Sequence, residues 1–435
     1  MIFDTITLIL MAAIILLAVA TPFLSPFWKA PLPAMAEPGD STEPEEELEN
    51  TEGSEEASEE PSENIEEEPS AASEATPLVA SEADETAELH EPRPAMTILI
   101  TVQQKQATML ARHLPLFLNQ CYDADFEVVV VAEKGDSDSE DVLNGYASHP
   151  RLYATYIPDS SRYMSRKKLA ITLGVKAAHN EWIVLTDAHC SPSSDKWLSA
   201  IASHCPTGVG ESACNLVIGY ANYDDEAPAY YRFDRLKQAC HTMSEAVRRT
   251  AYRSVGCNIA FRKSEFIQGD GFRGNLQDTR GEYEFMVNKY ARRRQTAVAT
   301  ERDAWIIDDA PSRHAWLTHH IYYMHTRKHL KRSFRHRFLP FLNELGIHLT
   351  FVASLTIIAF AALTERWILL GVAVAALVAT IVIRTCIARK VIVAYDEDIA
   401  AWRVYPYELS SLWHKCYHRL RYWRANKSDF TSHKV

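Results

Sequence analysis

The sequence predicts an α/β fold with a mainly parallel sheet, joined to three helices that cross a membrane. Between residues 96 and 186, short apolar runs alternate with stretches of helical apolar spacing, which is the pattern of βαβ units. Three further apolar stretches are each long enough to span a bilayer. The eight cysteines contain no C-x-x-C pair and are not spaced like a secreted disulfide framework. Reduced thiols in a cytosolic domain are therefore expected.

The predicted strands are nearly uninterrupted apolar runs, as expected for strands that are buried on both faces of a sheet. They lie at residues 96–102, 127–131, 152–156 and 182–186. The helices between them are predicted at residues 107–119, 139–147 and 165–178. Beyond Asn222 the pattern weakens and predicts helices at 230–249 and 281–290 and a short strand at 259–261.

The acidic residues are concentrated in one segment near the N-terminus. Of the 57 acidic residues, 22 lie between residues 37 and 92, whereas none of the 45 basic residues does. With few large apolar side chains, such a segment cannot bury enough surface to offset the entropy of ordering it. We therefore predict a disordered linker at 37–93, between an N-terminal transmembrane helix at 1–26 and the α/β domain at 95–337.

Two apolar stretches near the C-terminus, about 345–363 and 367–383, are separated by three residues and predict a membrane hairpin at 345–385. Basic residues flank this hairpin on both sides, most densely at 327–337. The positive-inside rule places both flanks in the cytosol, with the N-terminus outside and the α/β domain inside. The basic tail at 386–435, with three tryptophans, is expected either to lie on the inner membrane surface or to form a short cytosolic appendage.

Asp187 and His189 directly follow the fourth predicted strand. Ligands of parallel sheets gather beyond the carboxyl ends of the strands. A carboxylate and an imidazole two residues apart in a turn can face one metal ion, a pair that suits Mn²⁺ better than Mg²⁺. A carboxylate that caps the turn beside a packed histidine is the alternative.

Three basic residues open the helix before that strand, in the sequence Ser165-Arg166-Lys167-Lys168. Basic side chains oppose the helix dipole at an N-terminus unless an anion lies near. A bound phosphate would explain them, with Lys168 among the candidate contacts, whereas a solvated basic turn is the alternative.

The stretch 165–198, SRKKLAITLGVKAAHNEWIVLTDAHCSPSSDKWL, resembles the family 2 inverting glycosyltransferases, and most of all a bacterial membrane-associated branch of that family. Similar segments follow in matching order at 256–263 (GCNIAFRK), 271–272 (GF), 281–288 (GEYEFMVN) and 325–329 (HTRKH). The resemblance covers roughly residues 96–337. It implies a GT-A fold, which is Rossmann-like with a mainly parallel sheet, a UDP- or GDP-sugar donor and a divalent cation, Mn²⁺ or Mg²⁺.

The resemblance also implies roles for individual residues. Asp187 would be a ligand of the metal or the diphosphate, and His189 would replace the usual second aspartate as a metal ligand. Glu282 takes the position of the general base, which is normally an aspartate. Because glutamate is one methylene longer, either the spacing differs or the base is Glu284.

Two further sets of residues follow from the same resemblance. Arg327 and Lys328 would approach the diphosphate as the leaving group forms, although the segment departs from the Q-x-x-R-W signature of processive synthases. The contact to the nucleotide base would come from Glu133, or from Asp136 or Asp138 after a slip in strand register.

The sequence thus predicts a membrane-anchored inverting glycosyltransferase with its catalytic domain on the cytosolic face of the inner membrane. Its acceptor would be a polysaccharide or a lipid-linked glycan, and no nucleic-acid partner is expected. A processive polysaccharide synthase and an inactive scaffold of a membrane assembly are the alternatives. A dinucleotide-binding oxidoreductase is excluded because no G-x-G-x-x-G follows the first strand.

Overall fold

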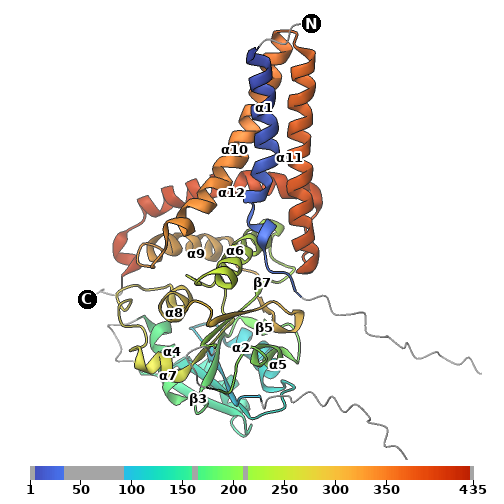
Figure 1. The fold of residues 1–435 in the computed structure, drawn as a ribbon. Coiled ribbons are helices and arrows are strands. Elements are labelled where there is room, and N and C mark those ends of the chain that lie inside the picture. The colour runs from blue at the N-terminus through green and yellow to red at the C-terminus, as the bar shows by residue number, and fades with distance from the viewer. Residues whose placement is uncertain (1–4, 34–92, 159–164, 209–213, 432–435) are drawn as a thin grey trace, which may run out of the picture. The chain divides into compact units, whose positions relative to one another are not determined.

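The computed structural model describes residues 5–33, 93–158, 165–208 and 214–431 (Figure 1). The predicted acidic linker lies outside the described residues, apart from its last position. All described residues belong to one of the two units into which the chain divides.

The main sheet has seven strands in the order β3-β2-β1-β4-β8-β6-β9. The strands are β1 (Met96–Thr101), β2 (Phe126–Glu133), β3 (Leu152–Ile157), β4 (Trp182–Asp187), β6 (Leu216–Gly219), β8 (Ile259–Arg262) and β9 (Thr296–Ala299). The first four are mutually parallel, as predicted, and β8 runs antiparallel to both of its neighbours. Because β1, β2 and β4 are parallel neighbours, their carboxyl ends meet at one edge of the sheet.

Helices cover both faces of this sheet. They are α2 (Ala107–Leu118), α3 (Ser137–Gly145), α4 (Arg166–Ala177), α5 (Trp197–Ala202), α6 (Ala229–Arg248), α7 (Lys263–Gln268) and α8 (Glu282–Tyr290). Alternate residues of β1 enter different cores, Ile98 with α2 and Leu99 with α4, because successive side chains of a strand point to opposite faces. The two cores therefore hold α2 and α4 on opposite sides of the sheet.

A second, three-stranded sheet has the order β5-β10-β7, with β5 at Cys190–Pro192, β10 at Ile306–Asp308 and β7 at Ala221–Tyr223. Its register places Asp308 opposite both Cys190 and Tyr223. Since β5 follows β4 after only two residues, this sheet brings a distant part of the chain to the end of β4. A short 3₁₀ helix, η3 (Arg302–Ala304), precedes β10.

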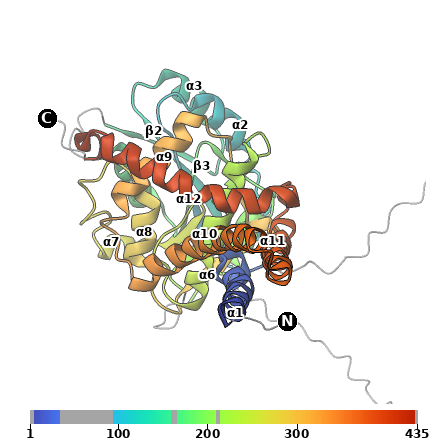
Figure 2. The ribbon, with the colours of Figure 1, turned by 90° about the horizontal axis from the view of Figure 1, so that it is seen from above.

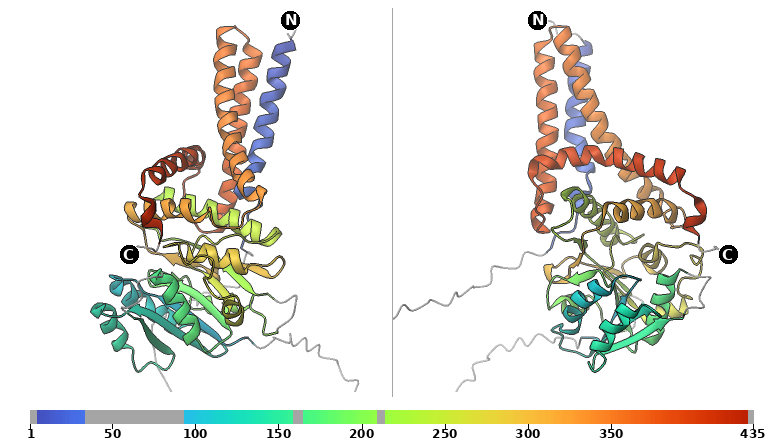
Figure 3. Two further views of the ribbon diagram at one scale, coloured as in Figure 1. Left: turned by 90° about the vertical axis from the view of Figure 1, so that its left-hand side faces the viewer. Right: turned by 180° about the vertical axis from the view of Figure 1, so that it is seen from behind.

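Within the described residues, three helices are long and apolar enough to cross a membrane: α1 (Thr5–Ala20), which continues to Leu24 through the 3₁₀ helix η1 (Thr21–Leu24), α10 (Phe334–Leu363) and α11 (Trp367–Ala394). They pack together around Ile14, Ala361 and Ala373 (Figures 1 and 3). The turn between α10 and α11 falls at the three residues predicted for it. A second 3₁₀ helix, η2 (Pro26–Lys29), packs against α6.

The basic tail forms a long helix, α12 (Ala401–Arg424), which crosses α9 (Arg313–Thr326) and α10 (Figure 2). A last 3₁₀ helix, η4 (Lys427–Phe430), then returns to the α/β domain, where the carbonyl oxygen of Phe430 accepts a hydrogen bond from Thr279 N at 3.0 Å. The tail therefore packs on the α/β domain and on the apolar helices.

Candidate active site

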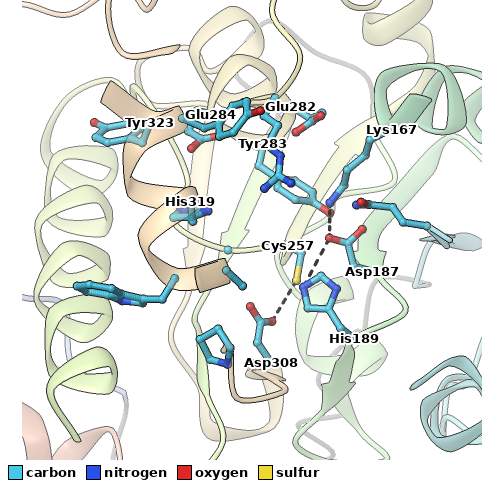
Figure 4. Close-up of a pocket in the computed structure, with 18 of the residues that line it drawn as sticks. Lys167, Asp187, His189, Cys257, Glu282, Tyr283, Glu284, Asp308, His319 and Tyr323 are labelled. Carbon is cyan, nitrogen blue, oxygen red and sulfur yellow. Dashed lines mark hydrogen bonds and ion pairs between the residues drawn. The ribbon is translucent and has the colours of Figure 1, made fainter. Parts of the chain in front are cut away.

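A cavity of about 1290 Å³ opens where the carboxyl ends of β1, β2 and β4 face α8 and α9. Its wall carries Glu133 at the end of β2, Asp187 at the end of β4, and Glu282 and Glu284 in the first turn of α8. Figure 4 shows Asp187, His189 and Asp308 together, with Glu282 and Glu284 across the cavity from them. The carboxylates at the ends of β2 and β4 and in α8, all predicted as site residues from the sequence, thus face one space.

Asp187 lies at the centre of a buried polar group. Its strand register places it opposite Thr101, whose hydroxyl donates a hydrogen bond to Oδ1 of the carboxylate. The Lys167 ammonium donates to Oδ2 at 2.5 Å. Burial by itself would raise the pKa of Asp187, but the charges of Lys167 and His189 and these hydrogen bonds hold it below its ordinary value.

The basic start of α4 is matched by carboxylates. Arg166 pairs with Glu133, and Lys167 pairs with Asp187; all four line the cavity. Lys168 points away, because one step along a helix rotates a side chain by about 100°. It is fully buried and lies outside the cavity wall, where its Nζ donates to the carbonyl oxygens of Asn275 at 2.7 Å and Asp278 at 2.5 Å.

Of the nucleotide-base candidates, the structure places only Glu133 in the wall of the cavity. It is buried and is the last residue of β2. Asp136 lies at the start of α3, where its carboxylate accepts a hydrogen bond from the Ser139 hydroxyl at 2.8 Å, and Asp138 follows in the first turn of that helix.

Glu282 is the first residue of α8 and is buried against the cavity. The Ser165 hydroxyl donates to its Oε1 at 3.3 Å. Glu284 is also buried in the wall, and burial raises its pKa above the ordinary value. Gly281 caps the helix with φ at 94°, a left-handed conformation that turns the chain into the cavity wall.

The end of β4 could hold a divalent cation. Oδ2 of Asp187 and Nε2 of His189 are 3.9 Å apart, and two ligands about 2.1 Å from one ion are at most about 4.2 Å apart. His189 Nδ1 is buried without a hydrogen-bond partner among the described residues. Ligand atoms of His189, Cys190 and Asp308 also lie within 4.8 Å of one another. The spacing and the donor types fit a cation, which would have to displace Lys167 from Asp187.

Asp308 and Arg235 are site residues that the sequence analysis did not predict. Asp308 is buried beside His189, and its Oδ2 is 2.5 Å from Arg235 Nη2. Its other oxygen accepts from the thiols of Cys190 at 3.1 Å and Cys257 at 3.3 Å. Burial would raise the pKa of Asp308, but the charges of Arg235 and His189 lower it. Asp308 is therefore an anion poised next to the candidate cation site.

The structure does not bring Arg327 and Lys328 into the cavity wall. They follow the last turn of α9, where the Lys328 ammonium donates to the Tyr422 hydroxyl at 2.9 Å. The side of α9 that lines the cavity carries Trp316, His319 and Tyr323 instead. The basic side chains in the wall are Arg166, Lys167, Arg235 and Arg280.

Comparison with known proteins finds similarity among solved structures alone. No family model and no curated protein matches the chain. A mannosyltransferase of Pyrobaculum calidifontis, PcManGT, in complex with GDP-Man and Mn²⁺, is 16% identical over 75% of this chain and 88% of its own, with a TM-score of 0.44. S. aureus TarS 1–349 in complex with UDP-GlcNAc is 12% identical over 73% of this chain and 92% of its own, with a TM-score of 0.37.

Proposed function

We propose that this chain is an inverting glycosyltransferase that takes a sugar from a UDP- or GDP-sugar. One observation carries the proposal: a cavity brings a cation-competent pair, Asp187 and His189, face to face with a buried carboxylate at a helix start, Glu282. A leaving nucleoside diphosphate needs positive charge, and an acceptor hydroxyl needs a base.

The cavity has room for a donor together with an acceptor. Its volume exceeds the roughly 300–1,000 Å³ of common small-molecule pockets. Glu133 would accept hydrogen bonds from the nucleotide base, since it ends β2 in the wall of the cavity that also contains Asp187. The phosphates would be contacted by Arg166, Lys167 and the exposed Arg280. For this contact, Arg166 and Lys167 would have to release their carboxylate partners and bind the ligand.

In the proposed reaction, Glu282 accepts the proton of an acceptor hydroxyl as its oxygen forms a bond to the anomeric carbon. The bond from that carbon to the diphosphate oxygen breaks on the opposite side, so the anomeric configuration inverts and the diphosphate takes the bonding electrons. Ser165 holds the Glu282 carboxylate in place through its hydrogen bond. Mn²⁺ or Mg²⁺, held by Asp187 and His189, would supply positive charge to the leaving group. Glu284, buried in the same wall, is the alternative base, and the pKa raised by its burial makes its ionised carboxylate a better proton acceptor than an ordinary one.

The acceptor is proposed to be a polysaccharide or a lipid-linked glycan on the cytosolic face of the inner membrane. The three long apolar helices and the basic segment at 327–337 support this location. A membrane anchor keeps a catalytic domain near substrates that are themselves attached to the membrane.

The internal pairing of Asp187 with Lys167 and of Glu133 with Arg166 favours one alternative, an inactive scaffold whose wall charges neutralise one another. Calorimetric titration separates the two. The full chain in detergent is titrated with UDP and GDP in Mn²⁺ and in EDTA, for wild type, Asp187→Asn and Glu282→Gln.

The transferase proposal expects cation-dependent binding of one nucleotide. The affinity should fall at least about 10-fold in Asp187→Asn and change less than about 2-fold in Glu282→Gln, because the base faces the acceptor. Binding of neither nucleotide by the wild type would support the scaffold instead.

A further inference from the structure

A second group of metal-ligating side chains lies behind the cavity wall. Asp278 is in the loop before α8, His325 is in the last turn of α9, and His329 follows one turn later. One ligand atom from each residue lies within 4.8 Å of the other two. None of the three is among the residues that line the cavity, so this group is separate from Asp187 and His189.

The Asp278 carboxylate, which is fully buried, faces both imidazoles. Its Oδ1 is 3.3 Å from His325 Nε2, and its Oδ2 is 2.9 Å from His329 Nδ1. Neither Oδ1 of Asp278 nor Nε2 of His325 makes a hydrogen bond within the described part of the chain, although both atoms are buried. Two ligands of a tetrahedral Zn²⁺, each about 2.0–2.1 Å from the ion, are about 3.3 Å apart. The two atoms therefore have the spacing that a shared cation produces.

Other side chains orient these ligands from behind. His325 Nδ1 is 3.2 Å from the Tyr422 hydroxyl of α12, and its ring stacks on Phe430 with 5.1 Å between centroids. Asn275 Nδ2 donates to Oδ2 of Asp278 at 2.6 Å. Partners of this kind fix the ring orientation of a ligating histidine and the direction of a ligating carboxylate.

We propose that Asp278, His325 and His329 bind a divalent transition-metal ion, Zn²⁺ before other cations. Two imidazoles and one carboxylate suit Zn²⁺ and are poor ligands for Mg²⁺ and Ca²⁺, which prefer oxygen. The His329 side chain is 36% exposed, so water can reach a fourth coordination position. This proposal is independent of the proposed transferase activity.

The site joins three segments that form the cavity wall. Asp278 pairs with Thr431 of the C-terminal segment in a short antiparallel bridge, and Thr431 lines the cavity. Glu282, the first residue of α8, follows Asp278 by four residues, and His325 belongs to α9 on the other side. A bound ion would hold the start of α8 against the end of α9. It would therefore help to fix the position of Glu282 without contacting that residue.

Metal binding by the full chain, purified in detergent without a polyhistidine tag and treated with chelator, tests the proposal. The parent protein for these measurements is the double variant Asp187→Ala/His189→Ala. It lacks the candidate cation site in the cavity but keeps Asp278, His325 and His329. We expect it to bind one equivalent of Zn²⁺, to show a Zn²⁺-dependent rise in unfolding temperature, and to give the visible bands of tetrahedral Co²⁺.

His329→Gln in this parent should lose the bound equivalent and the rise, because the glutamine amide can still donate to Asp278 but is not a zinc ligand. Asp278→Asn should do the same. His179→Gln is the matched control, since His179 makes the same kind of pair with Glu127 at 2.8 Å on the surface and should leave binding unchanged.

A parent that binds no Zn²⁺, or a His329→Gln variant that binds it within about 2-fold of the parent's affinity, would overturn the proposal. The histidines would then be only hydrogen-bonding partners of Asp278. Nucleotide binding is measured separately, on the chain in which both histidines and Asp278 are intact. Failure of one proposal therefore does not contradict the other.

Discussion

At the scale of single residues, the centre of the site is the buried pair of Lys167 and Asp187. Burial alone would lower the pKa of Lys167 and raise that of Asp187. The charge of the partner, together with other nearby charges and hydrogen bonds, outweighs burial, so that the pKa of Lys167 is raised and that of Asp187 is lowered. The Lys167 ammonium thus occupies the position beside the Asp187 carboxylate that a divalent cation would take in the proposed function.

Replacing Lys167 with methionine should destabilise the chelated protein by about 3 kcal/mol, because it removes the ammonium counter-charge of the buried Asp187 carboxylate. Added Mn²⁺ should restore part of this loss, so the Mn²⁺-induced rise in unfolding temperature should be larger in the variant than in wild type. The double variant Lys167→Met/Asp187→Asn removes both charges and should recover most of the stability. Equal Mn²⁺ effects in wild type and Lys167→Met would contradict a cation site at Asp187.

Glu284 gives a prediction about pH. Because burial raises its pKa above the ordinary 4.5, the folded state binds this proton more tightly than the unfolded state. The stabilisation that this provides is fully present below pH 4.5 and is lost as the pH rises through the folded-state pKa. Glu284→Gln cannot titrate, so its unfolding free energy relative to wild type should increase from pH 4.5 towards neutral pH. Thermal unfolding of both proteins across this range checks the slope, and a constant difference would contradict it.

At the scale of elements, the turn before α8 determines where Glu282 lies. Gly281 has φ at 94°, and a Cβ atom there would lie 2.6 Å from Cγ2 of Thr326 in α9. Gly135 has a similar φ of 88°, but nothing lies within 4 Å of its Cβ position. Both glycines have a left-handed conformation, but only Gly281 is also in close contact with another element.

Alanine at Gly135 should therefore cost only the left-handed conformation, about 1–2 kcal/mol. Alanine at Gly281 should cost more, because α8 and α9 must also move apart, and should slow turnover by displacing Glu282. Chemical unfolding and donor turnover of both variants measure the difference. If Gly281→Ala kept wild-type turnover, the position of Glu282 would not depend on this close contact.

The sequence predicts most elements around the site well, including α6, α8 and β8 within one residue at each end, and misses the shortest strands. Strands β1 to β4 and helices α2 to α4 are predicted within two residues at each end, because long apolar runs alternate with helical spacing. The strands β5, β7 and β10 have three residues each, too few to show a period. Asp308 reaches the site on β10, so neither it nor its partner Arg235 has a signal in the sequence.

The sequence pattern also does not predict which residue of a basic run faces a ligand. Lys167 and Lys168 are neighbours, but only Lys167 lies in the cavity wall. The rotation of α4 against the sheet decides between them, and that rotation depends on the packing of Ile171 and Val175 in the core. Arg327 and Lys328 lie outside the wall because they come after the end of α9, whose own residues line the cavity.

At the scale of the whole molecule, buried charges join the apolar helices to α12. Arg384 of α11 lies 2.5 Å from Glu408 of α12, and both are 1% exposed. The same guanidinium donates to Asn343 of α10 at 2.7 Å and to the carbonyl oxygen of Thr21 at 2.8 Å. Since α12 also packs on α9, the pair links the three long apolar helices to the helix that lines the cavity.

Arg384→Met should lower stability by about 3–5 kcal/mol, because Glu408 would remain buried without a counter-charge. Arg384→Met/Glu408→Met should be much closer to wild type, since neither charge then remains. Unfolding in detergent, followed by tryptophan fluorescence, compares the three proteins. A single variant within about 1 kcal/mol of wild type would show that water reaches the pair and that it does not hold α11 to α12.

The central proposal is most directly tested by nucleoside diphosphate release from UDP- and GDP-sugars by the full chain in detergent, with Mn²⁺, Mg²⁺ or EDTA. Wild type is compared with Glu282→Gln and with the exposed control Glu226→Gln. We expect cation-dependent release from one donor, at least about 100-fold slower in Glu282→Gln, as loss of a general base predicts, and unchanged in Glu226→Gln. No release from any donor by wild type, or wild-type release by Glu282→Gln, would contradict the proposed mechanism.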